Sequence, residues 1–328
     1  MTRISVVVPT ADRPDLLRTT LASIARQSAL ALVEEVIVSE NLGSLETAAV
    51  CEEFPEIPIT FVMQDPPLDS FEHFARILTM ARSEYVAIVC DDDWWTPGHL
   101  ATAIRNLDRE PSASAHVSCY VAAASEFPST GVFWGLGAIW LAAGRPDPIE
   151  PYVLDLAQVL ALAWAFTPFS FTTLVARREA LPKSLQEMLQ SPHTYYEDRM
   201  LFTALAKHGP IVYEPLVDTY YRAHAGGWER GKDPEFIQTL LRQCSDYVMG
   251  LARDVGVDPP ALWREYLTDV PPGVLSDVSD VFRNQLGAEL LAEHDLERLL
   301  TPLEVPPPPP FARRVVSGLK RRLWRGWR

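Results

Sequence analysis

Apolar residues in the first ninety positions follow two alternating spacings. Short apolar runs rich in β-branched residues, typical of buried strands, occur at 4–8, 35–39, 59–63 and 85–90. Between them, apolar residues recur at helical spacing at 15–27, 45–53 and 71–81. Such alternation predicts an α/β fold with a mostly parallel sheet flanked by helices on both faces. Loops after the strands should then share one crevice at the carboxyl ends.

Beyond residue 100 the spacing is less regular. Helical periods indicate helices near 99–107, 154–165 and 198–207. Residues 171–176 have the apolar character of a strand, whereas the Gly- and Trp-rich segment 131–145 has neither period. From about residue 233 the pattern is helical and polar, and we find no chemistry in it.

Proline marks the end of the globular part of the chain. Five consecutive prolines at 306–310 predict a stiff, extended spacer. We therefore expect an α/β domain over 1–230, a helical C-terminal region over 231–305, the polyproline linker, and a tail over 311–328.

The tail is basic and amphipathic. It contains seven basic residues and no acidic ones, and in a helix its apolar side chains fall mainly on one side. This pattern predicts a peripheral segment lying on an anionic membrane surface. A disordered tail that binds any anionic partner is the alternative, because Arg322 interrupts the apolar side and Trp324 lies among the cations.

Charge and cysteine content narrow the location and the partners. The chain has a net charge of −14. Outside the tail it has 22 basic and 43 acidic residues, and this excess of negative charge argues against binding nucleic acid. The four cysteines are dispersed and form no metal or redox motif. With no signal-peptide pattern at the start and no apolar run of about 20 residues, we expect a cytoplasmic protein at the inner face of the cell membrane.

Three consecutive carboxylates, Asp91, Asp92 and Asp93, follow the apolar run at 85–90. Their mutual repulsion raises at least one pKa unless a cation or several hydrogen-bond donors neutralise the site. Oxygen ligands favour Mg²⁺ or Mn²⁺, which typically binds one or two carboxylates together with substrate phosphates. The triplet therefore predicts a metal site for a diphosphate, with a solvated acidic loop as the alternative.

The segments around the triplet resemble a known family. Residues 6–14, VVVPTADRP, and residues 83–93, SEYVAIVCDDD, followed by Pro97, are similar to family 2 glycosyltransferases of the GT-A (Rossmann-like) fold. The resemblance extends over about residues 3–225. It implies an inverting enzyme that transfers a sugar from a nucleotide-diphosphate sugar to a hydroxyl of a glycan or lipid-linked acceptor, as in polysaccharide biosynthesis.

The resemblance also implies roles for individual residues on the donor side. Those that bind the nucleoside would be Pro9, Thr10, Asp12, Arg13 and Glu40. At the last of these positions the family usually has Asp, so the acid here is one methylene longer. Asp91 and Asp93 form the ends of the family's D-x-D motif and would hold Mn²⁺ or Mg²⁺, and Asp92 would contact the sugar or ribose.

On the acceptor side, the resemblance makes Asp198 of the pair Glu197-Asp198 the catalytic base. Capping of a helix N-terminus is the alternative role for Asp198. His224, in a later Gly-containing loop, would approach the metal or the diphosphate, and Arg222 and Arg230 are further diphosphate candidates.

Two other functions stay open from the sequence. A nucleotidyltransferase also places carboxylates and a metal on an α/β sheet, but it usually has a Gly-rich loop after the first strand, and residues 9–14 contain no Gly. A non-catalytic, membrane-bound module that binds nucleotide sugars is the other. The presence of both the triplet and the Glu197-Asp198 pair argues against it.

Overall fold

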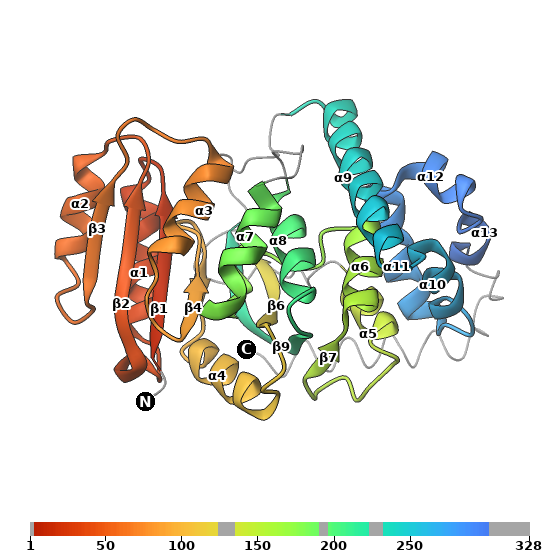
Figure 1. Ribbon diagram of the computed structural model, residues 1–328, viewed down its shortest axis with the longest axis horizontal. Helices are drawn as coiled ribbons and strands as arrows, with labels where there is room; N and C mark the ends of the chain where they lie inside the picture. Colours follow the sequence, from red (N-terminus) through yellow and green to blue (C-terminus); the bar gives the residue numbers. More distant parts are fainter. Residues whose placement is uncertain (1–2, 124–134, 190–195, 223–231, 302–328) are drawn as a thin grey trace, which may run out of the picture.

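The computed structural model describes residues 3–123, 135–189, 196–222 and 232–301. Figure 1 shows an elongated molecule with the first strands at one end and the last helices at the other. The predicted linker at 306–310 and tail at 311–328 lie outside the described residues.

Strands and helices alternate in the first ninety residues, as the sequence predicts. The elements are β1 (Ile4–Thr10), α1 (Pro14–Ala25), β2 (Val33–Glu40), α2 (Leu45–Glu52), β3 (Ile59–Met63), α3 (Ser70–Met80) and β4 (Tyr85–Ile88). The strands pair in parallel in the order β3-β2-β1-β4. Every residue of β1 and β4 is buried, which explains their continuous apolar runs.

The second half of the sheet is mixed. It is built from β5 (Trp94–Trp95), β6 (Ala115–Ala123), β7 (Tyr152–Leu154), β8 (Val175–Arg177) and β9 (Ile211–Arg222). Among the described residues the sheet has nine strands in the order β3-β2-β1-β4-β8-β6-β9-β5, with β7 paired to β9. Strand β8 runs antiparallel to β4 and β6, whereas β6 and β9 are parallel.

Several sequence expectations in this half need correction. Residues 171–176 do not form one strand, because Phe171–Thr173 is a 3-10 turn that precedes β8. Strands β6 and β9 were not predicted, since both carry buried polar side chains such as His116 and Glu214 that break the apolar pattern. The Gly- and Trp-rich segment contains a short helix, α5 (Leu136–Ala142).

The remaining helices of the sheet half are α4 (His99–Arg109), α6 (Leu156–Ala165), α7 (Leu181–Leu189) and α8 (Glu197–Ala206). Helix α6 begins two residues later than 154 because Asp155 forms a capping box with Gln158. Every residue from Val159 to the end of this helix is buried. It forms the link between the sheet and the C-terminal helices.

Five helices follow: α9 (Pro234–Asp254), α10 (Pro259–Tyr266), α11 (Pro272–Gln285), α12 (Gly287–Glu293) and α13 (Glu297–Leu300). They look polar in sequence because each buries only one face. That face belongs to the same core as α6, and the buried Trp263 donates from Nε1 to the Ala161 carbonyl over 2.8 Å. Ser245 likewise donates to the Trp164 carbonyl over 2.8 Å, so α9 and α10 both pack on α6.

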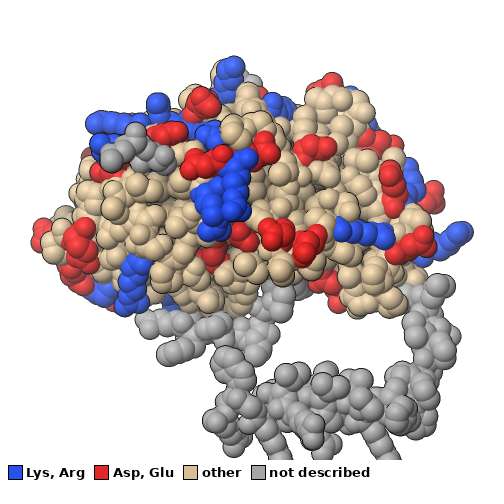
Figure 2. All heavy atoms as spheres, turned by 90° about the horizontal axis from the view of Figure 1, so that it is seen from below, with Lys and Arg blue, Asp and Glu red and all other residues tan. Residues whose placement is uncertain are grey.

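The surface carries both signs of charge. On the face shown in Figure 2, basic and acidic side chains of the described residues are interspersed rather than separated. Across the parts of the chain that the structure describes, no helix combines the length and the apolar character needed to cross a bilayer.

Candidate active site

The loops that follow β1, β2 and β4 meet at the carboxyl edge of the parallel strands, as the strand order requires. Thr10, the last residue of β1, donates from Oγ1 to Asp91 Oδ2 over 2.8 Å. Thr10 also lies opposite Glu40 in the β1–β2 register, and Pro9 lies opposite Ser39. The first nucleoside candidates and the acidic triplet are therefore in direct contact.

Glu40 organises the loop after β1. Its buried carboxylate accepts from the Asp12 N–H over 3.1 and 3.2 Å and from the Leu42 N–H over 2.7 Å. Asp12 has φ +53°, a left-handed conformation that these hydrogen bonds help to hold, and its side chain is exposed. Glu40, which is one methylene longer than the usual Asp, thus positions the loop after β1 and leaves the Asp12 carboxylate facing solvent.

Asp91 is hydrogen-bonded to the first loop, and Arg13 of that loop links it to Asp92. Its Oδ2 accepts from Thr10 and, over 3.4 Å, from the Ala11 N–H, while Oδ1 accepts from Arg13 over 3.2 Å. Arg13 also donates to Asp92 Oδ2 over 3.1 Å. Burial and the neighbouring Asp92 charge raise the pKa of Asp91 to about 6, although Arg13 and the two hydrogen bonds oppose the shift.

Asp93 has one satisfied and one unsatisfied oxygen. Its Oδ1 accepts from the Arg222 N–H over 2.8 Å. Its Oδ2 is buried and has no hydrogen-bond partner among the described residues. Burial and the charge of Asp92 raise the pKa of Asp93 well above its usual range, although the Arg222 N–H and the Thr172 hydroxyl oppose the shift. A cation at Oδ2 would satisfy this carboxylate.

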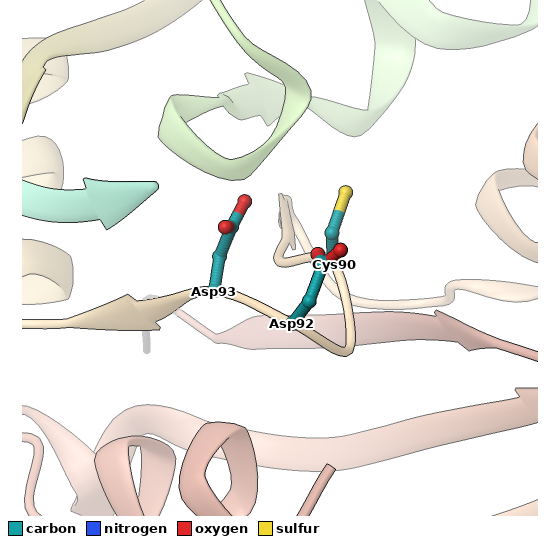
Figure 3. Close-up of side chains that lie close together, drawn as sticks. All are labelled: Cys90, Asp92 and Asp93. Atoms are coloured by element: carbon teal, nitrogen blue, oxygen red, sulfur yellow. The ribbon is translucent and has the colours of Figure 1, made fainter. Parts of the chain in front are cut away.

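We call residues 90–93, which connect β4 to β5, the acidic loop. The ligand atoms of Cys90, Asp92 and Asp93 all lie within 4.8 Å of one another, and Figure 3 shows the three side chains projecting to the same side of the loop. Burial raises the pKa of the Cys90 thiol well above its ordinary value, so it stays protonated and is a poor ligand. The two carboxylates fit a hard divalent ion such as Mg²⁺ or Mn²⁺.

Backbone groups of the acidic loop are held by α1 and β9. Thr20 of α1 places Oγ1 2.9 Å from the Asp91 carbonyl and 2.7 Å from the Asp93 carbonyl. Arg222, at the end of β9, donates from Nε to the Asp92 carbonyl over 2.8 Å and lies over the Trp94 ring at 4.7 Å. Its buried Nη2 has no partner among the described residues, so this guanidinium can still bind an anion beside Asp93.

A pocket of about 410 Å³ lies beside the acidic loop and contains Cys90 and Asp198 in its lining. We call it the aromatic pocket because six aromatic residues line it: Phe74, Tyr120, Phe166, Phe171, Tyr196 and Tyr221. Tyr120 on β6 and Tyr221 on β9 have ring centroids 6.1 Å apart, and Phe74 stacks on Phe171 at 4.6 Å. Its volume is that of a small-molecule site.

Asp198 lies in the first turn of α8 and accepts from the Arg199 N–H over 2.8 Å. The N-cap residue of this helix is Tyr196, which makes no side-chain cap bond, while Asp198 bonds a first-turn N–H, so stabilisation of the helix N-terminus stays open as an alternative role for Asp198. Tyr196 has φ +58°, and the residues that follow it, Glu197 and Asp198, both line the aromatic pocket. Burial raises the pKa of Glu197, which favours its protonated form.

The structure brings together nearly all residues that the sequence singled out. His224 and Arg230 are the exceptions, because residues 223–231 lie outside the described residues. Sequence reasoning gave no role to Thr20, Tyr120 or Gln285. A polar residue on the apolar side of the 15–27 helix was the only signal for Thr20, and the other two reach the site through strand pairing and helix packing.

Comparison with known proteins identifies the chain. The family model described as "Glycosyl transferase family 2" matches residues 5–183. The chain belongs to this family. It is therefore a glycosyltransferase, and the sequence-based alternatives of a nucleotidyltransferase or a non-catalytic module give way to an enzyme of sugar transfer. No match was found among curated protein sequences.

Solved structures share the fold of this glycosyltransferase. S. aureus TarS 1-349 in complex with UDP-GlcNAc is 13% identical with a TM-score of 0.54, over 91% of this chain and 90% of that one. The mannosyltransferase PcManGT from Pyrobaculum calidifontis, in complex with GDP-Man and Mn²⁺, is 20% identical with a TM-score of 0.54, over 99% and 82% of the chains. The predicted GT-A-type α/β fold with C-terminal helices is confirmed.

Proposed function

We propose that this glycosyltransferase transfers a sugar from a nucleotide-diphosphate sugar to an acceptor hydroxyl, with metal assistance and inversion at the anomeric carbon. The observation that carries the proposal is the buried Oδ2 of Asp93, which has no hydrogen-bond partner among the described residues. The acidic loop that holds it also borders the pocket lined by Asp198. A donor diphosphate at the loop and an acceptor in the pocket would meet between these two carboxylates.

The nucleoside half of the donor would bind at the edge formed by the ends of β1 and β2. The side chains and backbone proposed to contact it belong to Pro9, Thr10, Asp12, Arg13 and Glu40. Support comes from the hydrogen bonds that join these residues into one preformed surface. The similar structures of TarS and PcManGT were solved with UDP-GlcNAc and GDP-Man, so a nucleotide sugar is the donor class we propose here.

Asp93 and Asp92 would hold the divalent ion, either Mn²⁺ or Mg²⁺. Support comes from the grouping of their oxygens within 4.8 Å, and from the Mn²⁺ bound in the PcManGT structure. When bound, the ion would neutralise charge on the departing nucleoside diphosphate. Asp91 stands at the other end of the D-x-D motif, but its oxygens already accept from Thr10 and Arg13, and we propose that it fixes the nucleoside loop.

Arg222 would bind the diphosphate directly. Its Nη2 is buried without a partner among the described residues, and its backbone N–H already bonds Asp93. Its stacking on Trp94 and the bond from Nε to the Asp92 carbonyl fix the direction of the guanidinium. A positioned guanidinium beside a developing phosphate charge stabilises the transition state more than the ground state.

Asp198 would accept the proton of the attacking hydroxyl. The helix N-terminus favours the ionised carboxylate that a base needs. The other acid of the pocket is Glu197, whose pKa is raised by burial, and we assign it no part in the chemistry, which leaves Asp198 as the one base. One base without an enzyme nucleophile implies single displacement and inversion.

The test is release of nucleoside diphosphate from a panel of UDP-, GDP- and dTDP-sugars, with Mn²⁺ or Mg²⁺ and with membrane extract as a source of acceptors. Asp93→Ala and Asp198→Ala are the matched controls. We expect release by the wild-type chain with at least one donor and background release by both variants. Equal release by wild type and variants would refute the assignment of these residues.

A location at the inner face of the cell membrane and a glycan or lipid-linked acceptor are also proposed. Support comes from the sequence of residues 311–328, whose basic and apolar residues suit an anionic membrane surface. His224 keeps its proposed place near the metal or diphosphate as an inference from the family resemblance alone.

A further inference from the structure

The aromatic pocket receives part of its wall from outside the region that the family model matches. The match ends at residue 183, so Tyr196, Glu197, Asp198 and Tyr221 also lie beyond it, but Val281 and Gln285 come from α11. Both residues belong to the C-terminal helices, a part of the chain in which the sequence shows no chemistry. This part of the wall is therefore a feature of the chain's own C-terminal region.

Helix α11 is firmly placed against the pocket. Its Asp277 accepts from the Gly137 N–H of α5 over 3.0 Å, and a Cβ at Gly137 would lie 2.7 Å from the same carboxylate oxygen. One turn further along, Val281 and Phe282 are buried in the core, before the helix ends at Gln285. Because α11 is fixed at these points, its end presents Gln285 to the pocket in a defined position.

The amide of Gln285 lacks a protein partner for one of its polar atoms. Its Oε1 is buried and makes no hydrogen bond to any described residue, although the side chain lines the pocket. Leaving a buried acceptor unpaired is unfavourable, and a ligand hydroxyl would relieve it. A primary amide can accept from one hydroxyl and donate to another, which matches the alternating groups of a sugar.

The charges of the residues that line the aromatic pocket limit the class of ligand that can bind there. Glu197 and Asp198 contribute carboxylates to the pocket, and none of its described lining residues is Lys or Arg. A phosphate or a uronate in this pocket would meet like charge without a compensating cation. Six aromatic side chains with a few polar groups instead suit a ring that has apolar C–H faces and hydroxyl edges.

We propose that Gln285 is a specificity-determining residue for the acceptor, and that the acceptor unit in the aromatic pocket is a neutral sugar hydrogen-bonded to its amide. This inference rests on the proposed function, since it assigns the pocket of Asp198 to the acceptor. It places a residue that selects the acceptor in the C-terminal helices, about a hundred residues beyond the end of the family match at residue 183.

The test uses the full chain and a panel of methyl glycosides of neutral hexoses and N-acetylhexosamines, each paired with the corresponding uronate. Binding is measured by saturation-transfer NMR in the presence of UDP or GDP, and transfer by nucleoside diphosphate release. We expect at least one neutral glycoside to bind, its uronate to bind at least tenfold more weakly, and Gln285→Met to weaken the neutral glycoside about tenfold with an unchanged KM for the donor.

Arg283→Gln, on the exposed side of the same helix, is the matched control and should bind as the wild type does. The inference is overturned if no neutral glycoside binds, if uronates bind equally well, or if Gln285→Met binds the sugar normally. Failure of the proposed function looks different: Gln285-dependent sugar binding would persist while no donor releases nucleoside diphosphate.

Discussion

Asp93 combines features that conflict unless something binds to it. It is 1% exposed, its Oδ2 lacks a partner among the described residues, and its neighbour Asp92 carries the same charge. Such a carboxylate destabilises the fold in its ionised form, because burial without a counter-charge is unfavourable. The destabilisation is understandable if the residue is kept for binding a cation.

Replacing Asp93 by Asn should therefore separate stability from function. We expect Asp93→Asn to melt at the wild-type temperature or above it, since the variant no longer buries an acidic group whose pKa has to be raised, while activity falls at least about 100-fold. Millimolar Mn²⁺ should raise the melting temperature of the wild type and not that of the variant. Differential scanning fluorimetry with EDTA-treated protein measures both melting temperatures. An equal Mn²⁺ shift in the two proteins would place the ion elsewhere.

Some contacts at the carboxyl edge of the sheet can be predicted from the sequence, and others cannot. Contact between the loop at Thr10 and the acidic triplet follows from parallel strand order, and the structure has that hydrogen bond. The separation of Asp91 from Asp92 and Asp93 does not follow, because it depends on the side-chain directions in a tight turn held by Thr20. The place of Gln285 depends on the packing of a helix far along the chain and leaves no local signal.

Among the elements, β6 and β9 form a long parallel pair, and they carry a buried polar cluster. His116 of β6 is fully buried with no hydrogen-bond partner for either ring nitrogen among the described residues. Nearby, His99 of α4 lies 3.0 Å from Asp218 of β9 through Nδ1. Strand prediction relies on apolar runs, and these polar residues interrupt the runs of β6 and β9, so neither strand was predicted. The apolar runs of β1 and β4 allowed both of those strands to be predicted.

This cluster predicts a pH dependence of stability. Burial lowers the pKa of His116 to about 3, against about 6.5 in an unfolded chain. Below pH 6.5 the unfolded chain binds a proton that the folded chain does not, so stability is greatest above pH 6.5 and falls as the pH decreases toward 3. At pH 5 the loss from this residue is about 2 kcal/mol.

Urea unfolding of wild type, His116→Phe and His116→Asn at pH 7 and pH 5 measures this contribution. Both variants should lose less free energy of unfolding than the wild type between the two pH values, by about 2 kcal/mol. Two replacements of different polarity separate the loss of the titrating ring from changes in packing. The same pH slope in all three proteins would contradict the assignment.

For the molecule as a whole, charge is divided very unevenly along the chain. The chain outside residues 311–328 has 22 basic and 43 acidic residues, and the tail has seven basic residues and no acidic ones. An acidic body is repelled by an anionic surface, so we propose the basic tail as the segment that attaches to a membrane.

Vesicle sedimentation with full-length protein and with a chain ending at residue 310 tests the tail. We expect full-length protein to sediment with vesicles containing anionic lipid, with binding reduced in high salt, and the truncated chain to stay in the supernatant. Neutral phosphatidylcholine vesicles are the control for non-specific pelleting. Equal sedimentation of both chains with anionic vesicles would show that the tail is not needed for membrane binding.

We propose that Asp93 and Asp198 together carry out a metal-assisted, inverting transfer. The most direct measurement is ¹H NMR of the product's anomeric proton during turnover, with the donor and acceptor found in the panel assays. We predict a product with the anomeric configuration opposite to that of the donor, and product formation abolished by EDTA. Asp198→Asn should turn over at least about 100-fold more slowly than the wild type, with an unchanged donor KM. A product that retains the donor configuration, or full activity of Asp198→Asn, would contradict the claim.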